Sequence, residues 1–335
     1  MLTDRPAGVA PSCLYCGYSG FDPWLSGVRD RLGVSQAEWA FWRCQDCGSA
    51  MLVPCPSPAE LAAFYPPVYD FAPWMTPATS GLARVRAWLE YALFFGPLNA
   101  AHARQIDRAT HGGPGRDRSI LDIGCGQGLL LLAFRRLGYK VVGADFRLAV
   151  AEYLKQRFNI PVVCTDVAGL ATRFEPGSLD VVTAIHVLEH VPDVHRVLQD
   201  CFRLLRPGGW VVASIPAVES VQARLLGSSW AAATEAPRHV SIPSMNGMAR
   251  ACREAGFSRV ELQPGAYLDC LGALVLSVVP RLGSRHRPQR WFETASLLAV
   301  AAGVGILAIP WVWGESYVVR RPALAVVFAQ RPEEL

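Results

Sequence analysis

The sequence has no large excess of charge of either sign. Its 335 residues contain 32 Lys and Arg against 28 Asp and Glu, so the formal net charge at pH 7 is +4. Binding to nucleic-acid phosphates relies on a strongly basic surface. A nucleic-acid partner is therefore not expected from the composition.

The beginning of the chain also lacks the apolar core of a secretory signal, because residues 1–12 contain no hydrophobic run. Ten cysteines are present, but six stand alone and the other four form two C-x-x-C pairs. This arrangement is typical of a reducing cytoplasm rather than of a disulfide framework. With 51% hydrophobic residues, the chain can bury a large core in about two domains.

A third feature that is missing is the G-x-G-x-x-G fingerprint of dinucleotide sites. Residues 119–128 read Ser-Ile-Leu-Asp-Ile-Gly-Cys-Gly-Gln-Gly instead, which gives G-x-G-x-G after a short apolar run. An apolar helical pattern starts at Leu129. The order predicts a buried strand, a tight glycine turn and a helix whose N-terminus faces a ligand.

Further strands with polar ends follow in order. Asp145 ends the apolar run 141–144, and Asp166 follows a third short run. The run 179–184 leads into Leu188-Glu189-His190-Val191-Pro192-Asp193, and Leu205-Arg206-Pro207-Gly208-Gly209 leads into the run 210–215. Helical patterns lie between these runs, which predicts a parallel α/β sheet covered on both faces. Ligands of such sheets bind at the carboxyl ends of the strands, where an acid suits ribose hydroxyls.

In these motifs the chain resembles the class I S-adenosylmethionine-dependent methyltransferases, especially the group that includes the ubiquinone-type O-methyltransferases. The resemblance covers residues 116–262 and returns at 323–329. It implies a Rossmann-like seven-stranded methyltransferase sheet, whose last strands lie at 260–262 and 323–329. The implied cofactor is S-adenosyl-L-methionine.

The resemblance also implies a set of cofactor contacts. The glycines would lie against the methionine part, one acid would hold its ammonium group, a second would accept from the ribose, and a third with its neighbouring amide would read the adenine edge. Two residues after the fourth strand would line the site. In this order the residues are Gly124 and Gly126, Asp122, Asp145, Asp166 with Val167, and Ile185 with His186.

Histidines near the fourth strand are the candidate catalytic bases. His190 and His239 titrate near neutral pH, and Glu189 would orient one of them. The alternative is that Glu189 and His190 only cap or pack a turn. The ubiquinone-type enzymes carry Glu where this chain has His186, and a divalent cation is associated with that segment in them. The departure leaves such a cation open here.

The segment Pro237-Arg238-His239-Val240 resembles a part of the family that lies over the acceptor. Arg238 is predicted either to grip a phosphate or carboxylate of the acceptor or to be an ordinary surface arginine. Trp230 would supply an aromatic side chain over the same site. Ser244 is the expected N-cap of the following helix.

Two cysteine knuckles precede the predicted enzyme. Cys13 and Cys16 form the first, Cys44 and Cys47 the second, and a glycine follows each pair. Four thiolates suit one structural Zn²⁺ in a ribbon, with no open position for catalysis. The alternatives are unmetallated cysteines or a redox pair. The next proline-rich stretch, with Tyr65-Pro66-Pro67-Val68-Tyr69, is either a lid over the cofactor or a plain linker.

An unusually apolar stretch interrupts the end of the sheet. Residues 270–280 are apolar except for Ser277, four arginines follow, and residues 294–314 carry no charge. One bilayer crossing would place the last strand on the wrong side of the membrane. The stretch is therefore either an interfacial or re-entrant anchor or a helical hairpin buried in the core or in a homodimer interface.

Together these patterns predict a zinc ribbon (1–55), a helical lead-in and lid (56–115), a methyltransferase core (116–262) and an apolar helical insertion with the final strand (263–335). The expected activity is methyl transfer, by O-methylation, to a small-molecule, glycan or lipid-linked acceptor. The expected location is the cytoplasm, peripheral on the inner face of the membrane. Two alternatives remain: an RNA methyltransferase that uses the ribbon as RNA reader, and a non-catalytic cofactor-binding scaffold.

Overall fold

The structure is a computed structural model that describes residues 12–65, 81, 85, 88–89, 91–111, 117–167, 169–280 and 291–333. The strands are β1 (Phe21–Arg29), β2 (Glu38–Cys44), β3 (Ala50–Val53), β4 (Ser119–Ile123), β5 (Lys140–Asp145), β6 (Val162–Cys164), β7 (Leu179–Ile185), β8 (Leu205–Pro216), β9 (Ser241–Ile242), β10 (Arg259–Pro264) and β11 (Leu324–Gln330). The α-helices are α1 (Pro58–Ala63), α3 (Gly96–His111), α4 (Leu129–Arg136), α5 (Leu148–Phe158), α6 (Val194–Leu204), α7 (Val221–Leu226), α8 (Met245–Glu254), α9 (Tyr267–Val278) and α10 (Trp291–Trp313). The shorter helices include the π-helices η1 (Tyr91–Phe95) and η7 (Gly314–Val318), and the 3₁₀ turns η2 (Leu170–Thr172), η3 (Leu188–His190), η4 (Gly227–Ser229) and η5 (Ala233–Glu235).

The larger sheet has seven strands in the order β10-β11-β8-β7-β4-β5-β6. The strands from β8 to β6 in this order are parallel, and β11 pairs antiparallel with both β8 and β10. The predicted seven-stranded sheet is confirmed, and so are its last two strands. Parallel neighbours bring the carboxyl ends of β4, β5, β6 and β7 to one edge.

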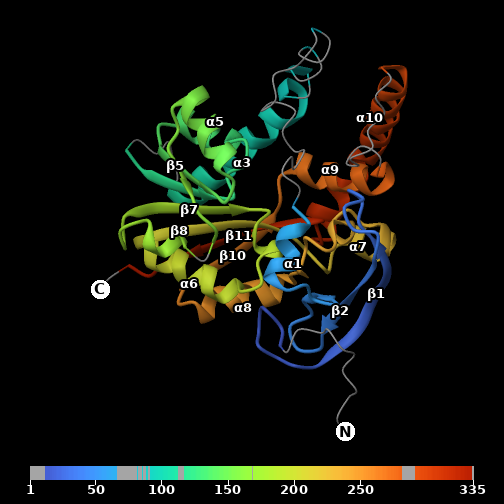
Figure 1. Cartoon of the computed structure of the whole chain (residues 1–335), viewed down its shortest axis with the longest axis horizontal. Helices are drawn as coiled ribbons and strands as arrows, with labels where there is room; N and C mark the ends of the chain where they lie inside the picture. Colours follow the sequence, from blue (N-terminus) through green and yellow to red (C-terminus); the bar gives the residue numbers. More distant parts are fainter. Residues whose placement is uncertain are drawn as a thin grey trace.

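Helices cover both faces of this sheet, as predicted. α6 and α8 pack on one face, and α3 and α4 pack on the other (Figure 1). Successive residues of the central strands alternate between the two cores. Val181 and Val212 face α3 and α4, whereas Val182 and Val211 face α6 and α8. A strand buried on both faces reads as a continuous apolar run, which explains the sequence pattern.

The N-terminal segment forms a four-stranded antiparallel sheet in the order β1-β2-β3-β9. Its last strand is Ser241–Ile242, which comes from the middle of the predicted enzyme segment. The knuckle cysteines and Met51 share one buried cluster with Met248 of α8. The ribbon is therefore packed into the enzyme, while the segment boundaries at 55, 115 and 262 stay predictions.

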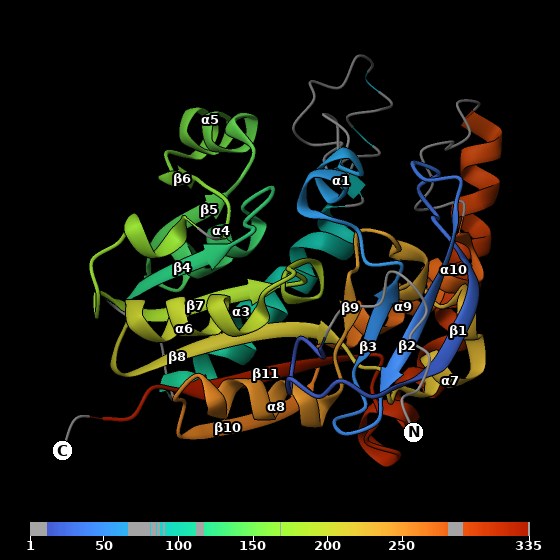
Figure 2. The same cartoon turned by 60° about the horizontal axis from the view of Figure 1, so that its bottom comes forward.

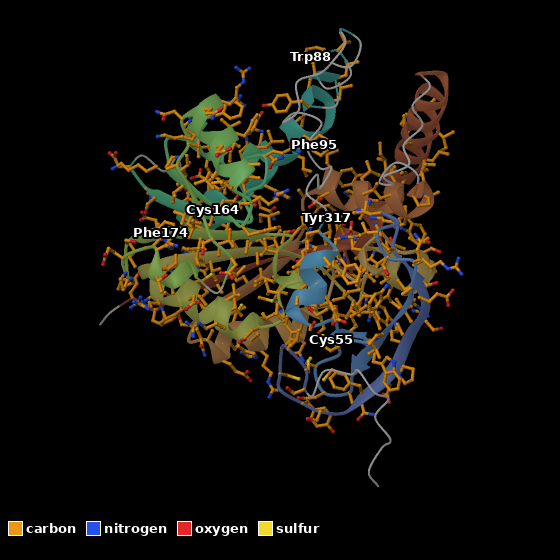
Figure 3. The ribbon with its side chains drawn as sticks, in the orientation of Figure 1. Cys55, Trp88, Phe95, Cys164, Phe174 and Tyr317 are labelled. Atoms are coloured by element: carbon orange, nitrogen blue, oxygen red, sulfur yellow. The ribbon has the colours of Figure 1, made fainter. Side chains whose placement is uncertain are left out.

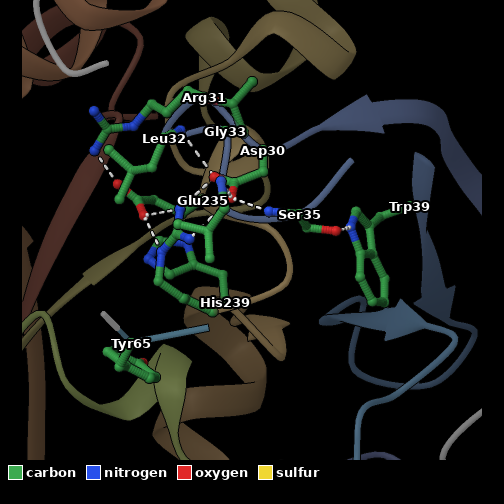
Figure 4. Close-up of polar contacts among 12 residues, drawn as sticks. Asp30, Arg31, Leu32, Gly33, Ser35, Trp39, Tyr65, Glu235 and His239 are labelled. Carbon is green, nitrogen blue, oxygen red and sulfur yellow. Dashed lines mark hydrogen bonds and ion pairs between the residues drawn. The ribbon is translucent and has the colours of Figure 1, made fainter. Parts of the chain in front are cut away.

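A buried ion pair joins the ribbon to the loop before β9. Arg238, which is not exposed at all, donates to Asp30 through Nη2 (2.6 Å) and Nη1 (3.2 Å) and to Glu235 through Nε (3.1 Å). Asp30 also accepts from the backbone N–H groups of Leu32, Val34 and Ser35 (Figure 4). Burial opposes ionisation of Asp30, but the hydrogen bonds and charge of Arg238 outweigh it and lower its pKa.

Both interpretations of Arg238 from the sequence are therefore wrong. The side chain neither faces an acceptor nor lies on the surface, because protein carboxylates surround it. Trp230 is corrected in the same way. It is completely buried in the core between the ribbon and β9, where it packs among apolar residues of both.

The apolar insertion lies between the last two strands, as predicted. α9 follows β10, α10 precedes β11, and the two helices pack against each other. α10 stands out from the body of the molecule in two views (Figures 1 and 2).

The Arg238–Asp30 pair should dominate the stability of the ribbon junction. We predict that Asp30→Ala lowers the free energy of unfolding by about 3–5 kcal/mol, because it leaves a buried guanidinium without its main partner. Urea denaturation followed by tryptophan fluorescence measures this loss. Arg29→Ala is the matched control, since Arg29 pairs with Glu38 on the surface (side chains 79% and 58% exposed) and should cost less than about 1 kcal/mol. Equal losses in the two variants would contradict the assignment.

Candidate active site

The glycine turn lies between β4 and α4, at the carboxyl edge of the sheet. Gly124, Gly126 and Gly128 all have positive φ (66°, 49° and 70°), which side chains rarely adopt. A Cβ on Gly124 would come within 2.8 Å of Val187, and one on Gly128 within 2.6 Å of Leu154. A Cβ on Gly126 would meet only Gly124 O (3.9 Å) and Arg147 Nη2 (4.0 Å), so the backbone is bare here and the Arg147 guanidinium lies beside it.

Asp145 ends β5 directly beside the turn, as predicted. Its carboxylate accepts from the Gly126 N–H (3.1 Å) and from the backbone N–H (3.0 Å) and guanidinium (3.0 and 3.1 Å) of Arg147. Four donors occupy the sites that a carboxylate offers. A further donor could reach the Asp145 carboxylate only in place of the Arg147 guanidinium, whose side chain is 27% exposed.

Asp122 lies deeper under the same edge. It is buried and accepts a hydrogen bond from Thr183 Oγ1 of β7 (2.7 Å). Burial raises the pKa of Asp122 to about 7, and the charge of Asp145 acts in the same direction. The carboxyl group therefore changes its charge near neutral pH.

Asp166 and Val167 follow β6, the neighbour of β5. Asp166 is exposed and accepts from the Gly169 N–H (2.8 Å), while Val167 is half-buried against the core. Thr165 N–H donates to the backbone carbonyl of Asp145 (3.1 Å), which holds this loop beside the second strand end. The loop therefore adjoins the glycine turn on the side away from β7.

His186 follows Ile185 at the end of β7 and lies between two carboxylates. Its Nε2 is 2.9 Å from Asp269 Oδ2 of α9, and its Nδ1 is 3.4 Å from Glu189 Oε1. Burial alone would lower the pKa of His186, but the charge and hydrogen bond of Asp269, together with the charge of Glu189, raise it well above the ordinary value. His186 is thus an imidazolium near neutral pH.

Two members of this cluster were missed from the sequence. Asp269 belongs to α9, and His102 of α3 lies 3.6 Å from the same carboxylate oxygen. Asp269 is the single charged residue of an otherwise apolar stretch, residues 266–280, and that isolation was the available signal. For His102 the sequence gives no comparable signal.

The three predicted catalytic residues come together. One ligand atom from each of Glu189, His190 and His239 lies within 4.8 Å of the others. Glu189 is completely buried, and neither of its carboxylate oxygens has a hydrogen-bond partner among the described residues. The rings of His190 and His239 are 4.6 Å apart. The three residues therefore form a polar cluster inside the protein, in which Glu189 and His190 belong to the 3₁₀ turn η3.

The two histidines differ in access. His239 is buried, and its Nδ1 lies 2.7 Å from the carbonyl of Ala232. His190 is half-buried, and its Nδ1 lies 3.1 Å from the carbonyl of Arg238 and 2.9 Å from Tyr65 Oη. Burial lowers the pKa of both histidines, that of His239 much further. An Nδ1–H tautomer of His190 leaves Nε2 as the proton acceptor.

Tyr65 links this cluster to the cofactor side. Besides His190, its ring contacts Phe146 edge-on, with centroids 5.8 Å apart. Phe146 is 55% exposed and follows Asp145 directly, an aromatic position that was missed from the sequence. Tyr65 thus lies where the predicted lid would begin, while residues 66–69 lie outside the described residues.

The four knuckle cysteines form a second cluster, remote in sequence from the first. Their sulfur atoms lie within 4.8 Å of one another, with Cys13–Cys47 at 3.5 Å and Cys16–Cys44 at 3.6 Å. A tetrahedron of Zn–S bonds of 2.3 Å has sulfur–sulfur edges of about 3.8 Å. Gly17 and Gly48 close the two turns by donating to the carbonyls of Cys13 and Cys44.

Comparison with known proteins identifies the protein family of the segment that carries the glycine turn. Residues 86–262, more than half of the chain, match the family model described as a methyltransferase domain. The chain belongs to the S-adenosylmethionine-dependent methyltransferases. The resemblance in the sequence motifs is thereby confirmed, and with it the expectation of an enzyme that uses S-adenosylmethionine.

Two relatives of this methyltransferase are named ubiquinone biosynthesis O-methyltransferase. The one from Albidiferax ferrireducens is 37% identical over 133 residues, 38% of this chain and 52% of the relative. The one from Burkholderia pseudomallei is 35% identical over 182 residues, 51% of this chain and 76% of the relative. The methyltransferase thus spans about half the length of the first relative. A solved methyltransferase from Archaeoglobus fulgidus covers 74% of this chain and 99% of its own, at 16% identity and a TM-score of 0.47.

The affinity for S-adenosylmethionine should depend on the protonation state of Asp122. If its carboxylate attracts the cofactor ammonium, binding weakens as the pH falls below about 7 and the carboxylate takes up a proton. We predict that wild type binds S-adenosylmethionine several-fold more tightly than Asp122→Asn at pH 8 and that this ratio approaches one near pH 6. Calorimetric titrations of both proteins measure it, and the comparison cancels the protonation of the cofactor itself. A ratio that does not change with pH would contradict the role.

Proposed function

We propose that this methyltransferase transfers the methyl group of S-adenosylmethionine to a hydroxyl oxygen of a small-molecule acceptor bound beside His186 and His190. The observation that carries the proposal is the cluster of His186, Glu189 and His190 next to the glycine turn. Oxygen as the atom methylated agrees with the names of the relatives, which are O-methyltransferases.

The residues at the strand ends fit the cofactor. Bare backbone at Gly126 leaves room for the methionine part, Asp122 lies below it, and Asp145 would accept from the ribose after Arg147 swings away. Asp166 and the Val167 amide would meet the adenine edge. When bound, the cofactor supplies a methyl group on a sulfonium sulfur, a good leaving group. Alignment of the acceptor in line with it is then the main task of the protein.

His190 and His186 have different roles in this proposal. The carbonyl of Arg238 holds the His190 Nδ1 proton, so Nε2 can take the proton of the acceptor hydroxyl as the O–C bond forms. The imidazolium of His186, fixed by Asp269 and Glu189, would stabilise negative charge on the acceptor oxygen. Glu189 and His239 would position His190 from behind.

The base assignment can be tested without knowing the natural acceptor. Purified protein is screened for S-adenosylhomocysteine formation with phenolic, glycan, lipid-linked and RNA acceptors. We predict that His190→Ala lowers kcat at least about 100-fold with the accepted substrate. Affinity for S-adenosylmethionine should stay within about twofold. His195→Ala is the control and should leave kcat unchanged, because this half-buried histidine of α6 lies beside Glu254 (3.8 Å) and outside the cluster.

Two results would overturn this proposal. Full activity of His190→Ala would remove the base. Activity that a chelator abolishes and a divalent cation restores, with zinc still bound to the cysteines, would assign Glu189, His190 and His239 to a cation instead.

We also propose that the four cysteines hold one structural Zn²⁺. The donor set, the sulfur–sulfur distances and the two glycine turns support it. Because Ser244 Oγ donates to the Cys47 carbonyl (2.5 Å) and caps α8, the metal would hold the ribbon against the enzyme.

Elemental analysis tests the zinc site. We predict one zinc per chain in wild type and none in Cys44→Ser. The melting temperature should also fall by several degrees, because the ribbon and enzyme share a core. Cys55→Ser is the control, since Cys55 lies outside the cluster and should keep the full metal content. One zinc per chain in Cys44→Ser would refute the site.

The acceptor class is open between a free small molecule, a glycan and a lipid-linked compound such as a quinone precursor. We favour the last, because the insertion that supplies Asp269 is itself apolar. Such an acceptor agrees with a cytoplasmic enzyme that works peripherally at the inner face of a membrane.

A further inference from the structure

The surface of α10 from residue 299 to residue 313, the part whose side chains the structure describes, is largely apolar. Ala301, Ala308 and Val312 are buried at the spacing of one helix face, and Val312 packs in a cluster with residues of α9. The remaining surface exposes large apolar side chains, with Ile306 67% and Leu307 82% exposed. A surface helix of a protein surrounded by water normally turns polar residues outward. We call the exposed residues of α10 the second apolar arm: Val300, Ile306, Leu307, Ile309, Trp311 and Trp313.

Another segment, far away in the sequence, exposes similar side chains. We call it the first apolar arm. It consists of Val85, Trp88, Leu89 and Leu93, which are 42–73% exposed. Trp88 lies at the end of an extension from the body, and Phe95 lies nearer its base (Figure 3). Both arms extend from the same side of the molecule in two views (Figures 1 and 2).

The two arms are connected to helices that come together beside His186. The first arm leads into α3, which carries His102, and the second is joined to α9, which carries Asp269. His102 and His186 both lie against the Asp269 carboxylate, at 3.6 and 2.9 Å. Both arms therefore extend from elements that contribute to the His186 cluster.

The chemistry of the second arm favours lipid over protein. Protein interfaces surround an apolar centre with a polar rim and about one hydrogen bond per 100–200 Å². Residues 294–314 carry no charge, and tryptophans lie at 311 and 313, where a headgroup region would hold them. Cations are available on both sides of this stretch: four arginines in the sequence 281–290, and the exposed Arg320 and Arg321. They would complement anionic headgroups.

The lengths of the helices in the insertion argue against a pair of bilayer-spanning segments. Among the described residues, one helical stretch, Ala299–Val318, is long and apolar enough to span a bilayer. Of its most apolar 18 residues, 28% are buried. Its partner α9 has 12 residues, about 18 Å of helix, which is too short to span in the other direction. The chain must also return to β11 in the sheet. An interfacial position satisfies both constraints.

We propose that the two apolar arms dock together on an anionic lipid bilayer and turn the acceptor site toward the membrane surface. Docking of this kind depends on the arms alone and does not require the reaction to be O-methylation. It gives a lipid-soluble acceptor a route to His186 that avoids water.

Flotation of the full-length protein with vesicles tests the proposal. The vesicles contain phosphatidylcholine with or without phosphatidylglycerol. We expect wild type to float with the anionic vesicles and to float several-fold less with phosphatidylcholine alone. The double variants Ile306→Glu/Leu307→Glu and Trp88→Glu/Leu93→Glu should each lower the floating fraction at least fivefold. Tyr18→Glu, an exposed aromatic position in the ribbon (47% exposed), is the matched control and should float like wild type.

Measuring the affinity for S-adenosylmethionine shows whether an arm variant is still folded when it no longer floats with vesicles. The arm variants should bind S-adenosylmethionine as wild type does, because they alter only exposed side chains. Wild-type protein that stays in solution with both vesicle types, or arm variants that float like wild type, would overturn the proposal. A wild-type dimer in solution that the Ile306→Glu/Leu307→Glu variant abolishes, without any flotation, would assign the second arm to a second copy of the chain. Flotation does not depend on turnover, so a failed acceptor screen leaves this result intact.

Discussion

The parallel sheet imposes the constraint on which the site depends. Because β4, β5, β6 and β7 run in one direction, their polar ends come to a single edge, and residues from Gly124 to His186 meet there. The hydrogen bond from Gly126 N–H to Asp145 joins the first two strand ends directly. The parallel pairing thus brings the glycine turn, the buried Asp122 and Asp145 to one edge of the sheet.

The acceptor side follows a different rule, since it is assembled from segments outside the central strands. Tyr65 comes from the end of the ribbon region, His102 from α3, His239 from the loop before β9 and Asp269 from the insertion. Around Glu189, His239 comes from such a segment, whereas His186 and His190 follow β7. The cofactor half is built from local motifs, whereas the acceptor half depends on tertiary packing.

This difference explains how far sequence reasoning reached. The strands, the glycine turn and the cysteine clusters were predictable because each is encoded within a few consecutive residues. The sequence predicted that Glu189, His190 and His239 act together in catalysis, but it did not predict the distances between them. Arg238 was misjudged because its partner Asp30 is about two hundred residues away, and a buried ion pair leaves no periodic signal. Trp230 was misjudged for the same reason, as its neighbours come from the ribbon. The ion pair between Asp145 and Arg147 was also not predictable, since two charges two residues apart in a sequence do not reveal which conformation the longer side chain adopts.

The place of Asp269 has a consequence for how such enzymes diversify. The matched family region ends at residue 262, so it contains the groups for the cofactor but lacks Asp269 and Tyr65. Replacing the insertion would exchange the counter-ion of His186 and the neighbouring apolar surface in a single step, while the glycine turn stayed intact. A different insertion between β10 and β11 would thus give the same methyl-donating sheet a different acceptor site.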